Sequence, residues 1–204
     1  SLWLKFSTFG KQTHASMPDN GLNANRIGME FALALDKMLH EKYPARDDYF
    51  DPPESTFEPT KKEKNVDAIN IVPGEDIVYF DLRILPRYNV EEVLKEINLL
   101  ASTFEKKTGA KIAVETVTKT IAPKPTDVNA KIVVMLKEAL EKTRGLKPKV
   151  GGIGGGTCAA YFRRAGIPAV VWSTADEMAH QPNEYAKIEN MVNDAKIFAL
   201  LAIT

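Results

Sequence analysis

The sequence contains a single cysteine, Cys158, so no disulfide bond can form within the chain. This fits a reducing compartment, and because no signal peptide is visible we expect a cytoplasmic protein. No run of about 18 apolar residues occurs, so no membrane span is expected. An excess of one charge is also missing, because 27 Lys and Arg balance 27 Asp and Glu. The balance argues against a nucleic-acid partner, since such proteins usually carry a basic excess.

The composition is that of a folded protein. Hydrophobic residues make up 44% of the 204 residues, which is too many for a disordered chain. The first residue, Ser1, is not an initiator methionine, and a strand pattern begins at once. We therefore expect that the sequence begins inside a longer protein.

Residues 1–120 show a pattern of alternating strands and helices. Period-two alternation predicts strands and 3.6-residue periodicity predicts helices. The predicted elements are a strand over 1–9, a helix over 22–39, strands near 65–72 and 76–85, a helix between the cap Asn89 and Gly109, and a strand over 111–118. Residues 43–59, rich in Pro and Asp, are predicted as a loop. The order βαββαβ is typical of a ferredoxin-like domain, an antiparallel sheet with two helices on one face.

Residues 121–204 have a different organisation, which starts with a stiff Pro-containing linker at 122–125. The predicted elements are a helix over 127–143, a strand near 147–150, a helix over 158–165, a strand over 167–172 and a helix over 188–202. The continuous apolar run 167–172 is typical of a strand buried on both faces of a parallel sheet. Since sheets usually have more than two strands, we interpret this half as the C-terminal portion of an α/β domain.

Two of the three histidines lie in loops among small and polar residues. His40, at the end of a charged helix, is interpreted as exposed and inert. His180 follows the predicted buried strand, and ligands gather at the carboxyl ends of such strands. Imidazole is a common metal ligand, and Glu184, four residues on, is a candidate partner for the ring. The alternative for His14 and His180 is an ordinary polar loop.

A glycine run at 151–156 precedes Thr157 and Cys158. It is not a phosphate-binding loop, because no Lys-Ser/Thr pair follows. Gly156 and Thr157 open a predicted helix, where backbone N–H groups favour a carboxylate or oxyanion, and a structural turn is the alternative. For Cys158 we expect a small buried residue rather than a nucleophile, since no base is identifiable nearby.

Arg83 lies on the strand face opposite the apolar one. A guanidinium group there could hold a substrate carboxylate through two hydrogen bonds. Alternatively it pairs with Asp81, two residues away on the same face.

Five short segments occur in an order that is specific to one family. They are Gly10–Pro18 with Gly21–Ala24, Asn70–Gly74, Asp81–Arg83, Gly155–Thr157 and Ala179–Glu184. Together they resemble the M20 family of zinc peptidases and deacylases, which includes succinyl-diaminopimelate desuccinylase, acetylornithine deacetylase, carboxypeptidase G2-like enzymes and aminoacylases.

The resemblance implies a zinc-binding α/β domain interrupted by a ferredoxin-like lid domain that forms a homodimer. It implies that His180 binds one of two zinc ions (cobalt being an alternative metal), and that Glu184 supports it. His14 would reach across the dimer to polarise the scissile carbonyl of an N-acyl amino acid or peptide. Asn70, Arg83, Gly156 and Thr157 would bind the substrate.

The sequence also departs from the family pattern. Cys158-Ala159-Ala160 stands where many members have a small polar residue and Asp, which puts fine substrate preference in doubt. The family's other zinc ligands and its Glu base come from an N-terminal part, so we expect the chain alone to be inactive. Two further functions remain open, a non-catalytic dimerisation module and a small-molecule-binding ferredoxin-like module.

Overall fold

The computed structural model describes residues 1–203, which divide into two compact units. The first unit comprises Ser1–Ala122 with Ile153–Gly155, and the second holds the rest of the described chain. Among the described residues, none of the helices combines the length and the apolar character needed to cross a bilayer.

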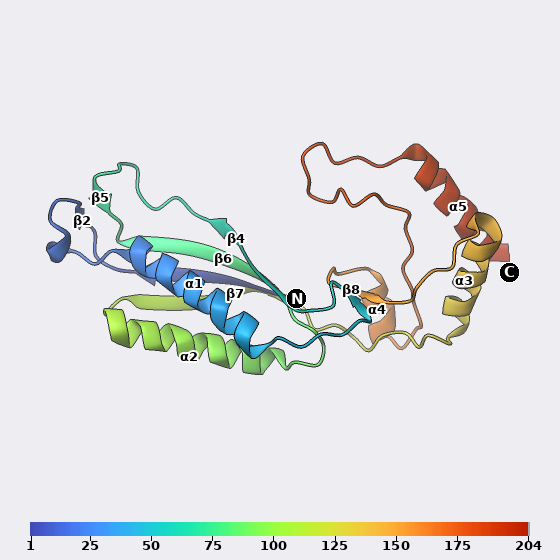
Figure 1. The fold of residues 1–204 in the computed structure, drawn as a ribbon, viewed down its shortest axis with the longest axis horizontal. Coiled ribbons are helices and arrows are strands. Elements are labelled where there is room, and N and C mark those ends of the chain that lie inside the picture. Colours follow the sequence, from blue (N-terminus) through green and yellow to red (C-terminus); the bar gives the residue numbers. More distant parts are fainter. Residues whose placement is uncertain (204) are drawn as a thin grey trace. The chain divides into compact units, whose positions relative to one another are not determined.

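A four-stranded antiparallel sheet with two helices on one face forms the first unit (Figure 1). Its strands lie in the order β4 (Thr56–Lys62), β6 (Glu75–Arg83), β1 (Leu2–Phe9) and β7 (Lys111–Lys119). The helices are α1 (Ala24–Lys42) and α2 (Val90–Thr108). Chain order and sheet order together confirm the predicted ferredoxin-like βαββαβ fold.

The core of the first unit lies between this sheet and its helices. Alternate residues of β1 and β6 point to the helices, as the period of a strand requires, and residues of α1 and α2 pack against them. The largest fully buried side chains here are Leu2, Leu4, Phe6, Phe31, Leu35, Leu39, Phe57, Phe80, Leu82 and Ile97. The Phe6 ring packs on Phe31 and on Phe80, with centroids 5.2 and 5.6 Å apart.

Both helices of the first unit begin at a side-chain cap. Asn23 Oδ1 accepts a hydrogen bond from the Arg26 amide at 3.0 Å, and Asn89 Oδ1 accepts one from the Glu91 amide at 2.9 Å. Helix α2 ends at Gly109, whose φ of 76° is in the left-handed region that favours glycine. These bounds confirm the prediction that the helix is capped by Asn89 and ends at Gly109.

The second strand of the sheet is not where the sequence predicts it. Residues 65–70 are not a strand, and β4 instead occupies 56–62, starting within the segment 43–59 that was predicted as a loop. Pro59 and the lysines are tolerated there because β4 is an edge strand, where a proline costs no ladder hydrogen bond on the open side. One side chain of the strand, Phe57, is buried, so the alternating pattern is too weak to see in the sequence.

Four short elements that precede β6 in the chain lie outside the main sheet. Strands β2 (Thr13–His14) and β5 (Ile71–Val72) pair in antiparallel fashion beside a short 3-10 helix, η1 (Pro18–Asn20). A two-residue strand, β3 (Phe50–Asp51), precedes β4.

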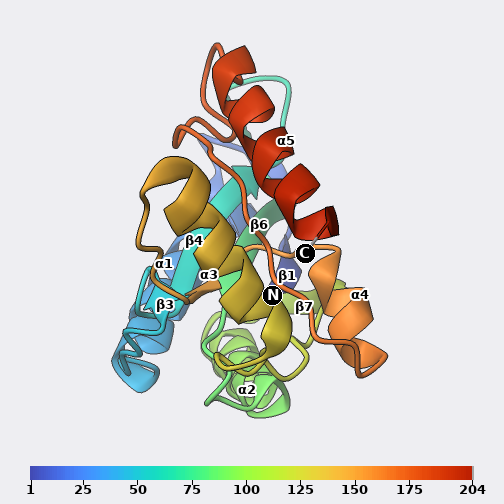
Figure 2. The ribbon, with the colours of Figure 1, turned by 90° about the vertical axis from the view of Figure 1, so that its right-hand side faces the viewer.

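The second unit is built around two helices that pack on each other, α3 (Lys131–Arg144) and α5 (Ile188–Ile203) (Figure 2). Leu136, Leu140 and Ile197 form the centre of their contact. The short helix α4 (Ala159–Arg164) belongs to the same unit, and β8 (Gly152–Ile153) lies where the chain passes between the units.

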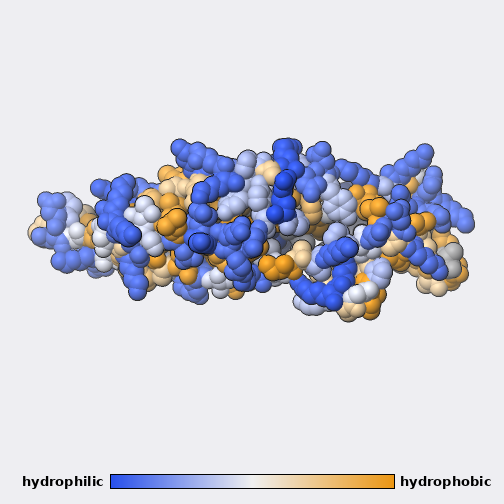
Figure 3. Space-filling view, turned by 90° about the horizontal axis from the view of Figure 1, so that it is seen from below, coloured by the Kyte–Doolittle hydropathy of each residue, from blue (hydrophilic) through white to orange (hydrophobic). Residues whose placement is uncertain are grey.

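The strands predicted at 147–150 and 167–172 are not formed in the described chain. A strand needs a hydrogen-bonding neighbour, and within the described residues the amide and carbonyl of Ala169 bind the Thr126 hydroxyl instead. Ile167 and Val171 are 53% and 55% exposed, contrary to the predicted burial on both faces. Apolar side chains of α5 such as Ile188 and Met191 are also exposed. On the face drawn in Figure 3, orange hydrophobic regions are scattered among hydrophilic ones.

Asp194 on α5 holds the segment that leads toward His180. Its Oδ1 accepts hydrogen bonds from Trp172 Nε1 at 3.1 Å and Thr174 Oγ1 at 2.6 Å, and its Oδ2 accepts one from the Thr174 amide at 2.7 Å. Burial raises the pKa of the Asp194 carboxyl, but the hydrogen bonds from Thr174 and Trp172 outweigh it, so the pKa lies below its ordinary value.

A lowered pKa in the folded state makes the second unit sensitive to acid. The stabilisation by Asp194 is complete above the carboxyl pKa of the unfolded chain, about 3.9, and is lost as pH falls through the lower folded-state value. We expect Asp194→Asn to lower the melting temperature by about 4–8 °C at pH 6–7, as loss of roughly 1 kcal/mol would. The difference from wild type should shrink as pH falls below about 3.9. Thermal unfolding followed by Trp172 fluorescence checks this, and a difference independent of pH would contradict it.

Candidate functional site

Backbone hydrogen bonds fix the loop that carries His14. The Gly10 amide donates to the Gly74 carbonyl at 2.8 Å, and Lys11 and Leu22 exchange two hydrogen bonds of 2.9 Å. At Gly10 a Cβ atom would lie 2.1 Å from the Leu22 carbonyl oxygen, so only glycine permits this close approach of the two backbones. The β2–β5 pairing then sets His14 opposite Ile71.

His14 and Asn70, both predicted as site residues, lie together on adjacent strand ends. Asn70 Nδ2 is 3.4 Å from His14 Nε2, and the Asn70 carbonyl accepts a hydrogen bond from the Ala15 amide at 2.8 Å. Both side chains are exposed. An imidazole and an amide held side by side and open to solvent can donate two hydrogen bonds to one oxygen atom of a ligand.

Ser16 contacts the other ring nitrogen of His14 and was not identified from the sequence. Its hydroxyl lies 2.8 Å from His14 Nδ1, and its amide donates to the same nitrogen at 3.2 Å. The Met17 amide donates to the His14 carbonyl at 2.9 Å, which closes a tight turn. The sequence signal that could have predicted this contact is a serine two residues after a histidine, in a segment that forms a turn.

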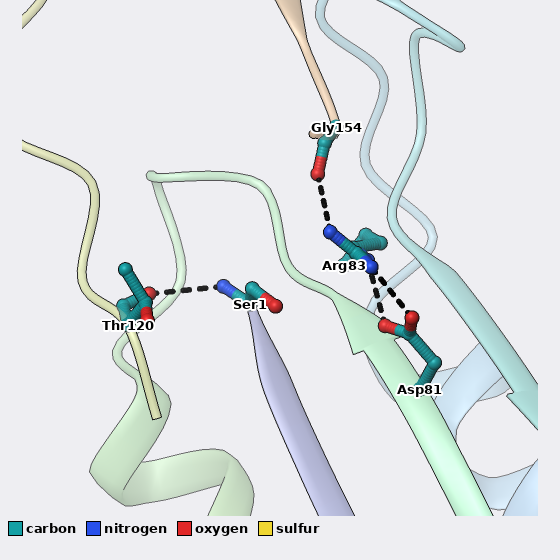
Figure 4. A network of polar contacts seen from close by, with 5 residues as sticks. All are labelled: Ser1, Asp81, Arg83, Thr120 and Gly154. Atoms are coloured by element: carbon teal, nitrogen blue, oxygen red, sulfur yellow. Dashed lines mark hydrogen bonds and ion pairs between the residues drawn. The ribbon is translucent and has the colours of Figure 1, made fainter. Parts of the chain in front are cut away.

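Arg83 is paired with Asp81, the alternative partner considered from the sequence (Figure 4). Its Nε and Nη2 each donate to a carboxylate oxygen of Asp81 at 2.6 Å, and Nη1 donates to the Gly154 carbonyl at 3.0 Å. Trp3 packs against the guanidinium group at 5.9 Å. Of the five N–H groups of a guanidinium, the contacts among described residues use three. Two remain for a ligand.

The His14–Asn70 pair and Arg83 do not meet within one chain. Asn70 and Ile71 precede β6, whereas Arg83 is its last residue. The nine residues of β6 span roughly 30 Å at the usual rise of a strand. A small substrate cannot reach both groups of the same subunit.

His180 and Glu184 lie in one turn of the second unit. Glu184 Oε2 accepts a hydrogen bond from the backbone amide of His180 at 3.0 Å, a contact to the backbone rather than to the ring. His180 has a φ of 62°, uncommon for a residue with a side chain and often found where function requires it.

The described residues do not by themselves complete a metal centre. No group of three or more His, Cys, Asp or Glu side chains among them is close enough to hold a metal ion. A zinc ion in a protein normally has three or four protein ligands, and His180 supplies one imidazole. The donor set of this chain alone therefore does not fit zinc.

Gly156, Thr157 and Cys158 lead into α4 (Ala159–Arg164). Gly156 is exposed, and the Thr157 carbonyl accepts a hydrogen bond from the Ala160 amide at 3.1 Å. Cys158 is exposed, not buried as the sequence predicted, because it stands at the start of the helix and outside the α3–α5 core. Thr157 and Cys158 line a hollow of about 500 Å³ in the second unit, whose other lining residues are apolar, among them Phe162 and Trp172.

Known proteins resemble the chain over nearly all of its length. The model of the M20 peptidase dimerisation domain matches residues 1–109. An uncharacterised metallohydrolase of Methanocaldococcus jannaschii is 43% identical over 97% of this chain and 50% of its own. A succinyl-diaminopimelate desuccinylase of Nitratiruptor sp. is 25% identical over 89% of this chain and 47% of its own.

Solved structures show the same fold. A tripeptidase of Staphylococcus aureus superposes with a TM-score of 0.70 at 21% identity, over 98% of this chain and 50% of its own. The aminopeptidase PepT of Bacillus cereus superposes with a TM-score of 0.66 at 25% identity, over 98% of this chain and 51% of its own. The chain thus spans about half the length of the relatives that it matches.

Proposed function

The chain belongs to the M20 peptidase family, and from this premise we propose that it is part of a metal-dependent amidohydrolase that cleaves the amide bond of an N-acyl amino acid or a small peptide. Relatives named metallohydrolase, desuccinylase and peptidase support this class of reaction. The chain alone is expected to be inactive, because its described residues do not complete a metal site.

The exposed His14–Asn70 pair is the observation that carries the proposal. Its donors can bind the carbonyl oxygen of a scissile amide and stabilise the negative charge that develops there during hydrolysis. Because Arg83 lies about 30 Å away along β6, we propose that the pair serves a substrate held by another subunit. A homodimer formed through residues 1–120, with His14 donated across the interface, meets this requirement.

Arg83 is proposed to bind a carboxylate of the substrate through its two remaining N–H groups. Asp81 holds the guanidinium plane in place, and the Gly154 carbonyl orients it from the opposite side. Gly156 and Thr157 are also proposed to bind substrate, as the family resemblance implies. A carboxylate next to the cleaved amide is found in N-acyl amino acids and at peptide C-termini.

His180 is proposed as one ligand of a two-zinc site, with cobalt as an alternative metal, in a polypeptide of the length of the curated relatives. Bound metal would supply a Lewis acid and a water molecule of lowered pKa. Glu184 is proposed to support His180 by accepting a hydrogen bond from its backbone amide. We place the enzyme in the cytoplasm, without a nucleic-acid or membrane partner.

A substrate screen tests the proposal. A polypeptide of the relatives' length would be incubated with N-succinyl, N-acetyl and N-formyl amino acids and with dipeptides, after addition of zinc or cobalt. We expect metal-dependent hydrolysis of at least one substrate with a free carboxylate, and a rise in KM for the matching carboxamide. Hydrolysis that survives chelation, or none with any substrate, would contradict it.

A further inference from the structure

The contacts of Ser16 determine which nitrogen of the His14 ring carries the proton. A backbone amide can only donate, so the Ser16 N–H directed at Nδ1 requires that nitrogen to be an unprotonated acceptor. The Ser16 hydroxyl, 2.8 Å from Nδ1, can donate to it as well. The proton of the neutral ring is then on Nε2.

We infer that Ser16 is a positioning residue that holds His14 in its Nε2–H tautomer, so that the ring donates to the substrate. The inference rests on the proposed function for its catalytic meaning, but the tautomer follows from this chain alone. The Asn70 amide nitrogen is the atom that faces Nε2, at 3.4 Å. With the proton on Nε2 both groups are donors and cannot bond each other, so both can donate to one oxygen atom of a ligand.

His40 provides an internal reference with the opposite tautomer. Its Nδ1 lies 2.9 Å from the Asp36 carbonyl oxygen, which can only accept, so Nδ1 carries the proton. His14 and His40 are both exposed side chains of the first unit, so solvent contact alone does not explain a difference between them.

The tautomers can be read from the ¹⁵N resonances of the imidazole rings in the 204-residue chain labelled at histidine, with assignment by single His→Ala variants. At a pH where the rings are neutral, His14 should show an unprotonated Nδ1 and a protonated Nε2, and His40 the reverse. Ser16→Ala keeps the backbone amide that donates to Nδ1 and removes only the hydroxyl, so the two His14 resonances should move part of the way toward each other as the second tautomer is admitted. Ser16→Thr keeps the hydroxyl and should restore them.

A protonated Nδ1 in wild-type His14, or His14 resonances that do not change in Ser16→Ala, would overturn the inference. In the hydrolase of the relatives' length, Ser16→Ala should lower kcat about fivefold, as expected for one lost hydrogen bond, with KM unchanged and with rescue by threonine. If that polypeptide hydrolyses nothing, the proposed function fails, while the resonances still decide the tautomer.

Discussion

Replacing His180 by alanine in a polypeptide of the relatives' length is expected to remove bound metal and to lower kcat by about a thousandfold or more. The physical reason is that loss of a direct ligand forfeits the several kcal/mol that a Lewis acid contributes to the transition state, and each 1.4 kcal/mol is a factor of ten. Metal content per subunit, measured by mass spectrometry beside the hydrolysis rate, checks both parts of the expectation.

His40→Ala is the matched control, because it removes an exposed imidazole of the first unit that contacts the Asp36 carbonyl and carboxylate on its own helix and the Phe57 ring. It should keep the metal and the rate of the wild type. Glu184→Gln changes the turn without removing the proposed ligand His180. The glutamine side-chain oxygen can still accept the hydrogen bond from the His180 backbone amide. If His180→Ala kept two metal ions and full activity, His180 would not be a ligand.

The fold of the first unit was predictable because its strong elements are local. Asn89 and Gly109 mark the ends of α2 by their own chemistry, and the alternation of Val78, Phe80 and Leu82 identifies a central strand. The edge strand β4 was missed because an edge needs few buried residues and tolerates Pro59. The sequence of a strand with few buried residues does not show the apolar alternation by which strands are predicted.

In the second unit, the sequence pattern predicted a strand that is not formed. The apolar run 167–172 has the composition of a buried strand, yet strand structure requires a partner, and Ala169 finds the Thr126 hydroxyl in the described chain. In the site, spacing alone could not show that Asn70 reaches His14 or that Ser16 binds Nδ1. Those contacts arise when β2 and β5 pair, which brings together His14 and Asn70, 56 positions apart in the sequence.

His14→Ala is expected to lower kcat by about 10²–10³, the usual effect of losing one donor to a developing oxyanion. Metal content should not change, since His14 and the residues bonded to its ring lie in the first unit and His180 in the second. If His14 acts across a two-fold dimer, each subunit lacking His14 keeps a usable metal site, and each subunit lacking His180 keeps a usable His14. The two inactive variants should therefore complement each other.

Mixing His14→Ala and His180→Ala subunits under exchange should restore about one quarter of wild-type activity, because half of the dimers are hybrids and each hybrid has one complete site. Without exchange the mixture should stay inactive, which serves as the control. A His14 that acted within its own subunit would give no recovery, because each hybrid site would lack either the donor or the metal ligand. β6 separates the His14–Asn70 pair from Arg83 of the same subunit by roughly 30 Å. A His14 that acted within its own subunit could therefore not contact the same small substrate as Arg83 of that subunit.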